Sequence, residues 1–356
     1  MRVMLVPPAS RGLVLITGGA GFIGTNLVDR LLRSGRSVRI YDNLSRSGAE
    51  QNLGWLRTVH GSRLQVERGD VRSAAGIRNA LTDVETVFHL AAQVAVTTSL
   101  ADPREDFLVN AAGTVNLLEE IRKTGRRIAL VYTSTNKVYG ALDDIPLAAA
   151  ATRYCPDGDL RGIDETRPLS FLSPYGCSKG TADQYVLDYA RAYNISGAVF
   201  RMSCIYGPHQ HGTEDQGWVA HFLIRAVQDL PITVYGDGKQ VRDLLYVEDL
   251  VDAFLQAEER LPEIAGHAFN IGGGPDNTIS LCELIDQIAL LSGGSPEVEY
   301  ETWRTGDQRW YVSNSAKFER ATGWRPRTSV EDGIWYLNEW ISLNQRRASA
   351  ARMVGS

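Results

Sequence analysis

The run Leu13-Val14-Leu15-Ile16-Thr17-Gly18-Gly19-Ala20-Gly21-Phe22-Ile23-Gly24 decides the fold class. Its apolar start predicts a buried strand, and the glycines at 18, 21 and 24 predict a sharp turn into the amphipathic helix that follows. Glycine suits this turn because a Cβ would keep a pyrophosphate away from the backbone N–H groups at the helix N-terminus. A glycine triplet alone is a weak signal, so the rest of the chain must supply the context.

That context is a repeated alternation of strand and helix patterns. Six apolar runs predict strands: Leu13–Thr17, Val38–Tyr41, Leu64–Arg68, Thr86–His89, Ile128–Ser134 and Gly197–Arg201. Amphipathic stretches between them predict helices, which makes each unit β-α-β. The sequence therefore predicts an α/β fold with a doubly wound parallel sheet of the Rossmann type, which binds its ligands at the carboxyl ends of the strands.

A smaller substrate-binding cap is expected after Arg201, where the pattern loosens. Six of the seven tryptophans lie beyond that residue: Trp218, Trp303, Trp310, Trp324, Trp335 and Trp340. The strand-like segments Leu244–Val247 and Ala268–Ile271 predict that the chain returns to the first domain. We therefore expect an NAD-binding domain over 12–201 with 244–272, a cap over 202–243 and 273–344, and a disordered tail over 345–356.

Composition excludes several classes of protein. A net charge of −5 and 44% hydrophobic residues indicate a globular protein that does not attract nucleic acid or an anionic membrane surface. The absence of a long apolar run or a signal-like start predicts a cytoplasmic location. The cysteines (Cys155, Cys177, Cys204 and Cys282) lack the spacing of a disulfide framework or a zinc site, so no metal is expected.

The strand ends supply side chains for a dinucleotide. Asp42, 18 residues after Gly24, is placed to accept hydrogen bonds from the adenosine ribose, and its charge favours NAD over NADP. Asp70 and Val71 follow the third strand near the expected adenine site, and small residues follow the fourth. The predicted cofactor-binding residues are Gly18, Gly21, Phe22, Ile23, Gly24, Asp42, Asn43, Ser45, Arg46, Asp70, Val71, Ala91, Ala92, Gln93, Tyr175 and Lys179.

Tyr175 and Lys179 are the predicted catalytic pair. Four residues apart on a helix that begins near Pro174, they share one helix face. An ammonium and an oxidised nicotinamide near the phenol would lower its pKa from about 10, by about 3 units if it is to act as a base at neutral pH. Thr135, at the end of the fifth strand, is predicted to bind the reacting oxygen, and Ser134 is the next candidate.

With these motifs in this order, the sequence resembles the extended short-chain dehydrogenase/reductase family, whose members act on nucleotide sugars. The specific matches are Ser134-Thr135-Asn136-Lys137-Val138-Tyr139-Gly140, Ser173-Pro174-Tyr175-Gly176-Cys177-Ser178-Lys179-Gly180, Asp215-Gln216-Gly217-Trp218-Val219 and Gly238-Lys239-Gln240-Val241-Arg242-Asp243. The resemblance is strongest to members that invert C2 of a CDP-hexose, and it implies catalysis by Thr135, Tyr175 and Lys179 with tightly bound NAD. A homodimer or homotetramer is also implied.

The predicted substrate-binding residues are Thr135, Asn136, Gln216, Arg242 and Arg309, and the two arginines are expected to clamp the diphosphate. His209 and His211 depart from the family pattern, which leaves the base and the sugar undetermined.

Three other functions share parts of this sequence pattern. A 4,6-dehydratase would need an acid and a base after the threonine, where this chain has Asn136 and Lys137. A 4-epimerase stays open, because the same residues serve whichever carbon faces the nicotinamide. A non-catalytic NAD-binding module would have no reason to retain Thr135, Tyr175 and Lys179 together.

Overall fold

The computed structural model describes residues 12–304 and 306–354. Its largest element is a seven-stranded sheet with the order β12-β8-β5-β4-β1-β2-β3, in which every neighbouring pair is parallel. These strands are β1 (Leu13–Thr17), β2 (Val38–Asp42), β3 (Leu64–Arg68), β4 (Val84–His89), β5 (Ala129–Thr135), β8 (Ser196–Met202) and β12 (Ala268–Ile271). The predicted doubly wound fold is confirmed.

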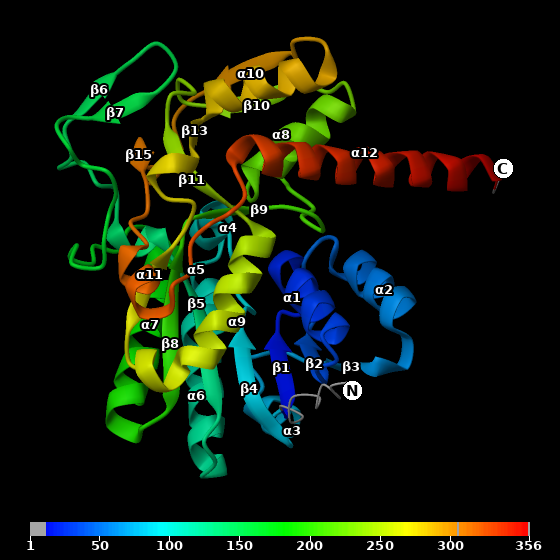
Figure 1. Ribbon diagram of the computed structural model, residues 1–356, viewed down its shortest axis with the longest axis vertical. Helices are drawn as coiled ribbons and strands as arrows, with labels where there is room; N and C mark the ends of the chain where they lie inside the picture. Colours follow the sequence, from blue (N-terminus) through cyan, green and yellow to red (C-terminus); the bar gives the residue numbers. More distant parts are fainter. Residues whose placement is uncertain (1–11, 305, 355–356) are drawn as a thin grey trace, which may run out of the picture.

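Helices cover both faces of this sheet (Figure 1). This is required because successive apolar side chains along a strand point to opposite faces of the sheet. Val14 and Ile16 belong to one buried cluster, whereas Leu15 belongs to the other. The first cluster includes α1 (Phe22–Arg33), α2 (Ala49–His60), α9 (Val247–Ile264) and α11 (Ala316–Thr322). The second includes α3 (Ala74–Ala80), α6 (Gly113–Thr124) and α7 (Ser173–Tyr193).

Between β4 and α6 the chain is helical but irregular. It forms α4 (Val96–Ala101), α5 (Pro103–Phe107) and a single π-helical turn, η2 (Leu108–Ala112), which leads directly into α6. Short 3₁₀ turns occur at η1 (Gly61–Arg63), η3 (Asn136–Tyr139) and η4 (Pro275–Asn277). Both α4 and α5 pack against α7, so this segment lies beside the predicted catalytic helix.

The cap lies at the carboxyl ends of the main strands and has its own apolar core (Figure 1). Its elements are β9 (Cys204–Tyr206), α8 (Trp218–Val227), β10 (Ile232–Tyr235), β11 (Val241–Tyr246), β13 (Thr278–Ser280), α10 (Leu281–Ser292), β14 (Val298–Glu301), β15 (Trp310–Tyr311) and α12 (Val330–Val354). The insertion before α7 forms a hairpin of β6 (Leu147–Ala149) and β7 (Tyr154–Pro156).

Two expectations about this part of the chain need correction. The segment at Leu244 does not return to the main sheet, because β11 pairs with β9, β13 and β15 in a separate sheet. Of the stretch 244–272, β12 joins the main sheet and α9 packs against it, while β11 contributes only Leu245 to the same buried cluster. The expected tail from Gln345 to Val354 continues α12, since its Ala, Arg, Gln and Met residues are good helix formers; residues 355–356 lie outside the described part.

No helix in the described part of the chain is long and apolar enough to cross a membrane.

Candidate active site

The glycine turn between β1 and α1 is so tightly packed that side chains do not fit. A Cβ on Gly24 would lie 2.3 Å from the Gly18 carbonyl oxygen, and one on Gly18 would lie 2.7 Å from the Ala91 backbone nitrogen. Gly18 also has a φ of +72°, in the left-handed region that glycine adopts without strain. The turn therefore brings backbone close to the helix N-terminus, and the residues present fit the pyrophosphate of a dinucleotide.

Asp42 ends β2 beside this turn. Its two carboxylate oxygens accept hydrogen bonds from the backbone N–H groups of Ala20 at 3.0 Å and Leu44 at 2.8 Å. Burial raises the pKa of Asp42, and these two N–H groups lower it. The carboxylate is thereby fixed in place with acceptor capacity left for ribose hydroxyls, as the prediction for this residue requires.

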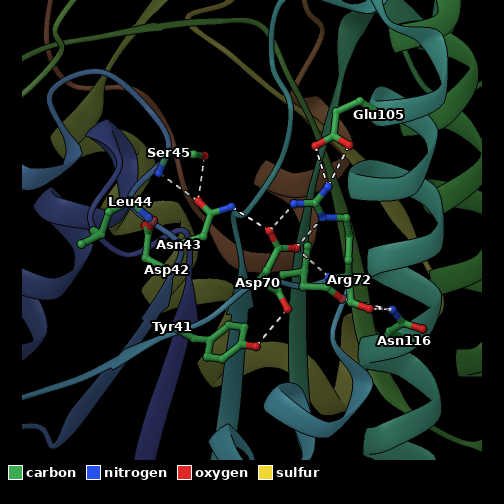
Figure 2. A network of polar contacts seen from close by, with 10 residues as sticks. Tyr41, Asp42, Asn43, Leu44, Ser45, Asp70, Arg72, Glu105 and Asn116 are labelled. Atoms are coloured by element: carbon green, nitrogen blue, oxygen red, sulfur yellow. Dashed lines mark hydrogen bonds and ion pairs between the residues drawn. The ribbon is translucent and has the colours of Figure 1, made fainter.

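The expected adenine end is a network of charged side chains (Figure 2). Arg72 donates to both oxygens of Asp70, at 2.9 and 2.7 Å, and to Glu105 at 2.8 Å. Asn43 donates to Asp70 at 2.9 Å, and the Ser45 backbone N–H donates to the Asn43 side chain. Hydrogen bonds and the Arg72 charge hold the pKa of Asp70 at about 2, so this carboxylate stays ionised. These hydrogen bonds fix the side chains of Asn43 and Asp70 and the backbone of Ser45 relative to one another.

Other predicted cofactor residues differ in what their side chains do. Phe22 and Ile23 line the cavity between the main sheet and the cap. Val71 is buried against Gly113, and the Gln93 amide folds onto the backbone of Ala95 rather than toward the sheet edge.

Arg46, one of the predicted cofactor-binding residues, also lies near the predicted catalytic end of the site. Its exposed guanidinium lies close enough to Tyr175 and Asp215 to interact electrostatically with both. Arg46 therefore faces across the cleft, toward the predicted catalytic end.

Thr135, Tyr175 and the neighbouring Ser134 line one cavity of about 440 Å³ between the main sheet and the cap. Thr135 ends β5, and Tyr175 lies in the first turn of α7. Ser134 is 2% exposed, and its hydroxyl has no hydrogen-bond partner among the described residues. The structure thus brings together the hydroxyl groups that the sequence placed on separate elements.

Lys179 lies beneath Tyr175 on the same helix face and is 3% exposed. Its ammonium donates to the Thr133 carbonyl oxygen and lies 4.4 Å from the centre of the Tyr132 ring. Burial lowers the pKa of Lys179 to about 7, and the nearby carboxylates of Asp183 and Asp106 oppose that change.

The expected depression of the Tyr175 pKa is not produced by the protein groups. Burial raises this pKa to about 12, and the charge of Asp106 adds to the increase, whereas a hydrogen bond with Thr135 and the charge of Arg46 lower it. Burying a phenolate costs more than nearby positive charge recovers here, and the Tyr-x-x-x-Lys pattern alone does not reveal that cost.

Four of the five predicted substrate-binding residues line the cavity, and Arg309 does not. Asn136, Gln216 and Arg242 line the cavity with Thr135. Arg242 is buried and pairs with Asp307 at 2.6 Å. Arg309 is not among the lining residues; its guanidinium lies 5.6 Å from the Tyr154 ring and 5.5 Å from the Trp303 ring.

Arg304 is the cation that sequence reasoning missed. It lines the cavity, lies 3.8 Å from the centre of the Tyr235 ring and donates to the Glu214 backbone oxygen at 2.9 Å.

The two histidines of the 209–211 loop have structural contacts. The His209 ring lies 4.2 Å from the Trp55 ring and 5.3 Å from the Trp340 ring, measured between centres. His211 bonds to the Asn52 side chain at 3.2 Å. Burial lowers the pKa of His209 to about 4, so its ring is neutral at physiological pH. The side chains of this loop therefore pack between α2 and α12.

Comparison with known proteins agrees with this geometry. Residues 14–272 match the NAD dependent epimerase/dehydratase family. The chain is 41% identical to the CDP-paratose 2-epimerase of Salmonella typhi over 336 residues, which cover 92% of this chain and 99% of that protein.

Solved structures give the same assignment. The UDP-glucose 4-epimerase of Thermotoga maritima, solved with UDP-glucose, superimposes with a TM-score of 0.81 at 30% identity and covers 94% of this chain and 99% of its own. The UDP-glucose 4-epimerase of Thermus thermophilus, solved with NAD, gives 0.78 at 32% identity, covering 92% and 98%. The protein thus belongs to the NAD dependent epimerase/dehydratase family of extended short-chain dehydrogenases/reductases, and it is an enzyme with NAD as its cofactor.

Proposed function

We propose that this enzyme is a nucleotide-sugar epimerase that inverts C2 of a CDP-hexose, as in the conversion of CDP-paratose to CDP-tyvelose. The observation that carries the proposal is the cavity in which Thr135 and Tyr175 stand beside Asn136 and Lys137. This set can move a proton to and from a carbinol oxygen, but Asn136 and Lys137 stand directly after Thr135, where a dehydratase is expected to have its acid and base. The similarity to a CDP-paratose 2-epimerase supports C2 as the reacting carbon.

NAD, when bound, accepts a hydride from the sugar carbon and returns it. Tyr175 takes the proton of the C2 hydroxyl, and Thr135 hydrogen-bonds the same oxygen, so that a 2-keto sugar forms. Once the sugar has turned, Tyr175 would return the proton to the same oxygen as the keto carbon is reduced from its opposite face. Lys179 supplies positive charge below the phenol.

The nucleotide must stay anchored while the sugar turns. Arg242 and Arg304 are the cavity-lining guanidiniums in the described part of the chain, and we assign the diphosphate to them. Arg309 is dropped from this role because its contacts lie outside the cavity wall. We also propose that the chain assembles as a homodimer or homotetramer, to be checked by light scattering.

Product analysis tests the reaction. The purified enzyme is incubated with CDP-, GDP- and UDP-hexoses in D₂O without added NAD, and the sugars are analysed by proton NMR. We expect a C2 epimer from a CDP-sugar with protium retained at C2, because hydride held within the site does not exchange with solvent. Deuterium at C2 would contradict the oxidation and reduction at that carbon.

The same experiment examines the second candidate, a 4-epimerase, which the likeness to UDP-glucose 4-epimerase structures favours. Inversion at C4 with C2 unchanged would replace C2 by C4 in the proposal. Failure to convert any of the sugars would favour a non-catalytic NAD-binding module.

A further inference from the structure

Asp106 is a buried carboxylate beside the catalytic helix that the reaction described above does not use. Its side chain is 0% exposed, and only one of its oxygens, Oδ1, has a hydrogen-bond partner among the described residues. That partner is Asn110, whose amide donates to Oδ1 at 3.1 Å. The other oxygen, Oδ2, is buried without a donor, which is costly for an ionised carboxylate unless a positive charge lies nearby.

Asn110 also forms hydrogen bonds with residues on the catalytic helix α7 and next to the cofactor-binding edge of the sheet. Its amide also donates to the Ser178 hydroxyl at 3.1 Å, and Ser178 precedes Lys179 on α7. Its side-chain oxygen accepts from the Gln93 backbone N–H at 2.9 Å, where β4 meets the cofactor edge. Asn110 lies within the π turn η2, and such turns occur frequently at functional sites. The irregular helix thus places Asp106 and Asn110 against α7.

Two carboxylates act on the Lys179 ammonium, but one of them is already paired. Asp183 receives two hydrogen bonds from Arg201 of β8, at 2.9 and 3.0 Å, in a buried bidentate pair. Asp106 has no cation within 4.0 Å among the described residues. The remaining titratable groups that face Lys179 are Tyr175 of α7, Tyr132 of β5 and His89 of β4, none of them an anion in its ordinary form.

We propose that Asp106 is a positioning residue of the active site: its carboxylate is the counter-charge that holds the buried Lys179 side chain as an ammonium beneath Tyr175. Burial raises the pKa of Asp106 and the Lys179 charge lowers it, while the Asp106 charge raises the pKa of Lys179, so the two ionised forms stabilise each other. The inference does not depend on which nucleotide sugar is the substrate.

Titration of Lys179 tests this directly. The chain has five lysines, so lysine labelled with ¹³C at Cε gives few NMR signals, and the Lys179 signal is assigned by its loss in Lys179→Met. Asp106→Asn keeps an acceptor for Asn110 but removes the charge. We expect the pKa of Lys179 to fall by about 1 unit in this variant, in the range typical for loss of a nearby opposite charge.

Glu105→Gln is the matched control, since Glu105 is the adjacent residue but faces Arg72. It should leave the Lys179 titration unchanged. A second readout is the pH profile of kcat: loss of a negative charge lowers the pKa of both Tyr175 and Lys179, so the whole profile of Asp106→Asn should move to lower pH. A residue that only packs α5 against α7 would change the rate without moving the profile. An unchanged Lys179 titration in Asp106→Asn overturns the proposal.

If Asp106→Asn does not fold alone, a stability comparison decides. Lys179→Met leaves Asp106 as a buried charge without its partner, which is strongly destabilising. Adding Asp106→Asn to Lys179→Met should therefore raise the melting temperature. A double variant that melts at the same or a lower temperature than Lys179→Met overturns the proposal.

Discussion

The two halves of the active site are built by different means. At the cofactor half, backbone groups determine the geometry: the glycine turn has no room for a Cβ at Gly18 or Gly24, and two backbone N–H groups hold Asp42 in place. At the substrate half, side chains from the cap, from β5 and from α7 form the wall; several of them are charged, and one of these, Arg242, is buried. The first half tolerates few residue types, whereas the second depends on how distant elements meet. Substitutions in the two halves should therefore fail in different ways.

The largest effect is expected from Tyr175→Phe. Loss of the proton acceptor should lower kcat by about 10³-fold, within the range of general acid–base catalysis, while the amount of bound NAD stays the same. Tyr185→Phe, on an exposed part of the same helix, is the control and should react at the normal rate. Rate measurements with cofactor quantification check both, and near-normal turnover by Tyr175→Phe would exclude it as the proton acceptor.

Gly24→Ala should damage the cofactor half most. Its Cβ would lie 2.3 Å from a backbone oxygen that cannot move independently, so we expect at least a tenfold loss of bound NAD and a decrease of about 2 kcal/mol in the free energy of unfolding. Gly54→Ala, where a Cβ meets nothing within 4 Å inside α2, should stabilise the protein slightly. Denaturant unfolding and cofactor content separate the two. Equal behaviour of both variants would mean that the turn is not sterically restricted.

Arg304→Ala and Arg309→Ala distinguish the two candidate clamps. Loss of a charged hydrogen bond is worth about 1.5–3 kcal/mol, so Arg304→Ala should raise KM for the nucleotide sugar by roughly 10- to 100-fold with kcat little changed. Arg309 stacks on aromatic rings away from the cavity wall, and its removal should leave KM within a few-fold of normal. A larger increase in KM for Arg309→Ala than for Arg304→Ala would show that Arg309, not Arg304, binds the diphosphate.

The smallest effect is expected from Asp42→Ala. Removing a carboxylate that accepts ribose hydrogen bonds should weaken NAD binding by about tenfold, because the backbone contacts of the turn remain. Isothermal titration of cofactor-free protein with NAD measures this change. Unchanged affinity would show that Asp42 serves only to fix the backbone of Ala20 and Leu44.

The sequence was most informative where the requirement is local. The glycine spacing predicts the turn because each glycine answers a steric need within a few residues, and the apolar runs predict six strands close to their observed bounds. The position of Thr135 at a strand end and the pairing of Tyr175 with Lys179 follow from the same short-range rules. What these residues do in catalysis stays a prediction until the variants above are measured.

Features that depend on distant contacts were not accessible in this way. Choosing between Arg304 and Arg309 requires knowing which residues between β14 and β15 line the cavity. The strand pairing of β11 is decided by β9, β13 and β15 together. The pKa of Tyr175 is raised because elements distant in the sequence cover this half-buried side chain, which the helix pattern around it does not reveal. Asp106 occurs in a polar, unremarkable stretch whose importance appears only when α5 is seen against α7.

The π turn at Leu108–Ala112 sets the rotational phase between α5 and α6. Each helical residue advances the side-chain direction by about 100°, so deleting one residue here would let an ordinary α-helix form while swinging everything upstream around the helix axis by that angle. The backbone would gain better geometry, and Asp106 would point somewhere else. The length of this segment is therefore constrained as tightly as its composition. A protein with the shortened helix would still fold, but Asp106 would no longer face Lys179.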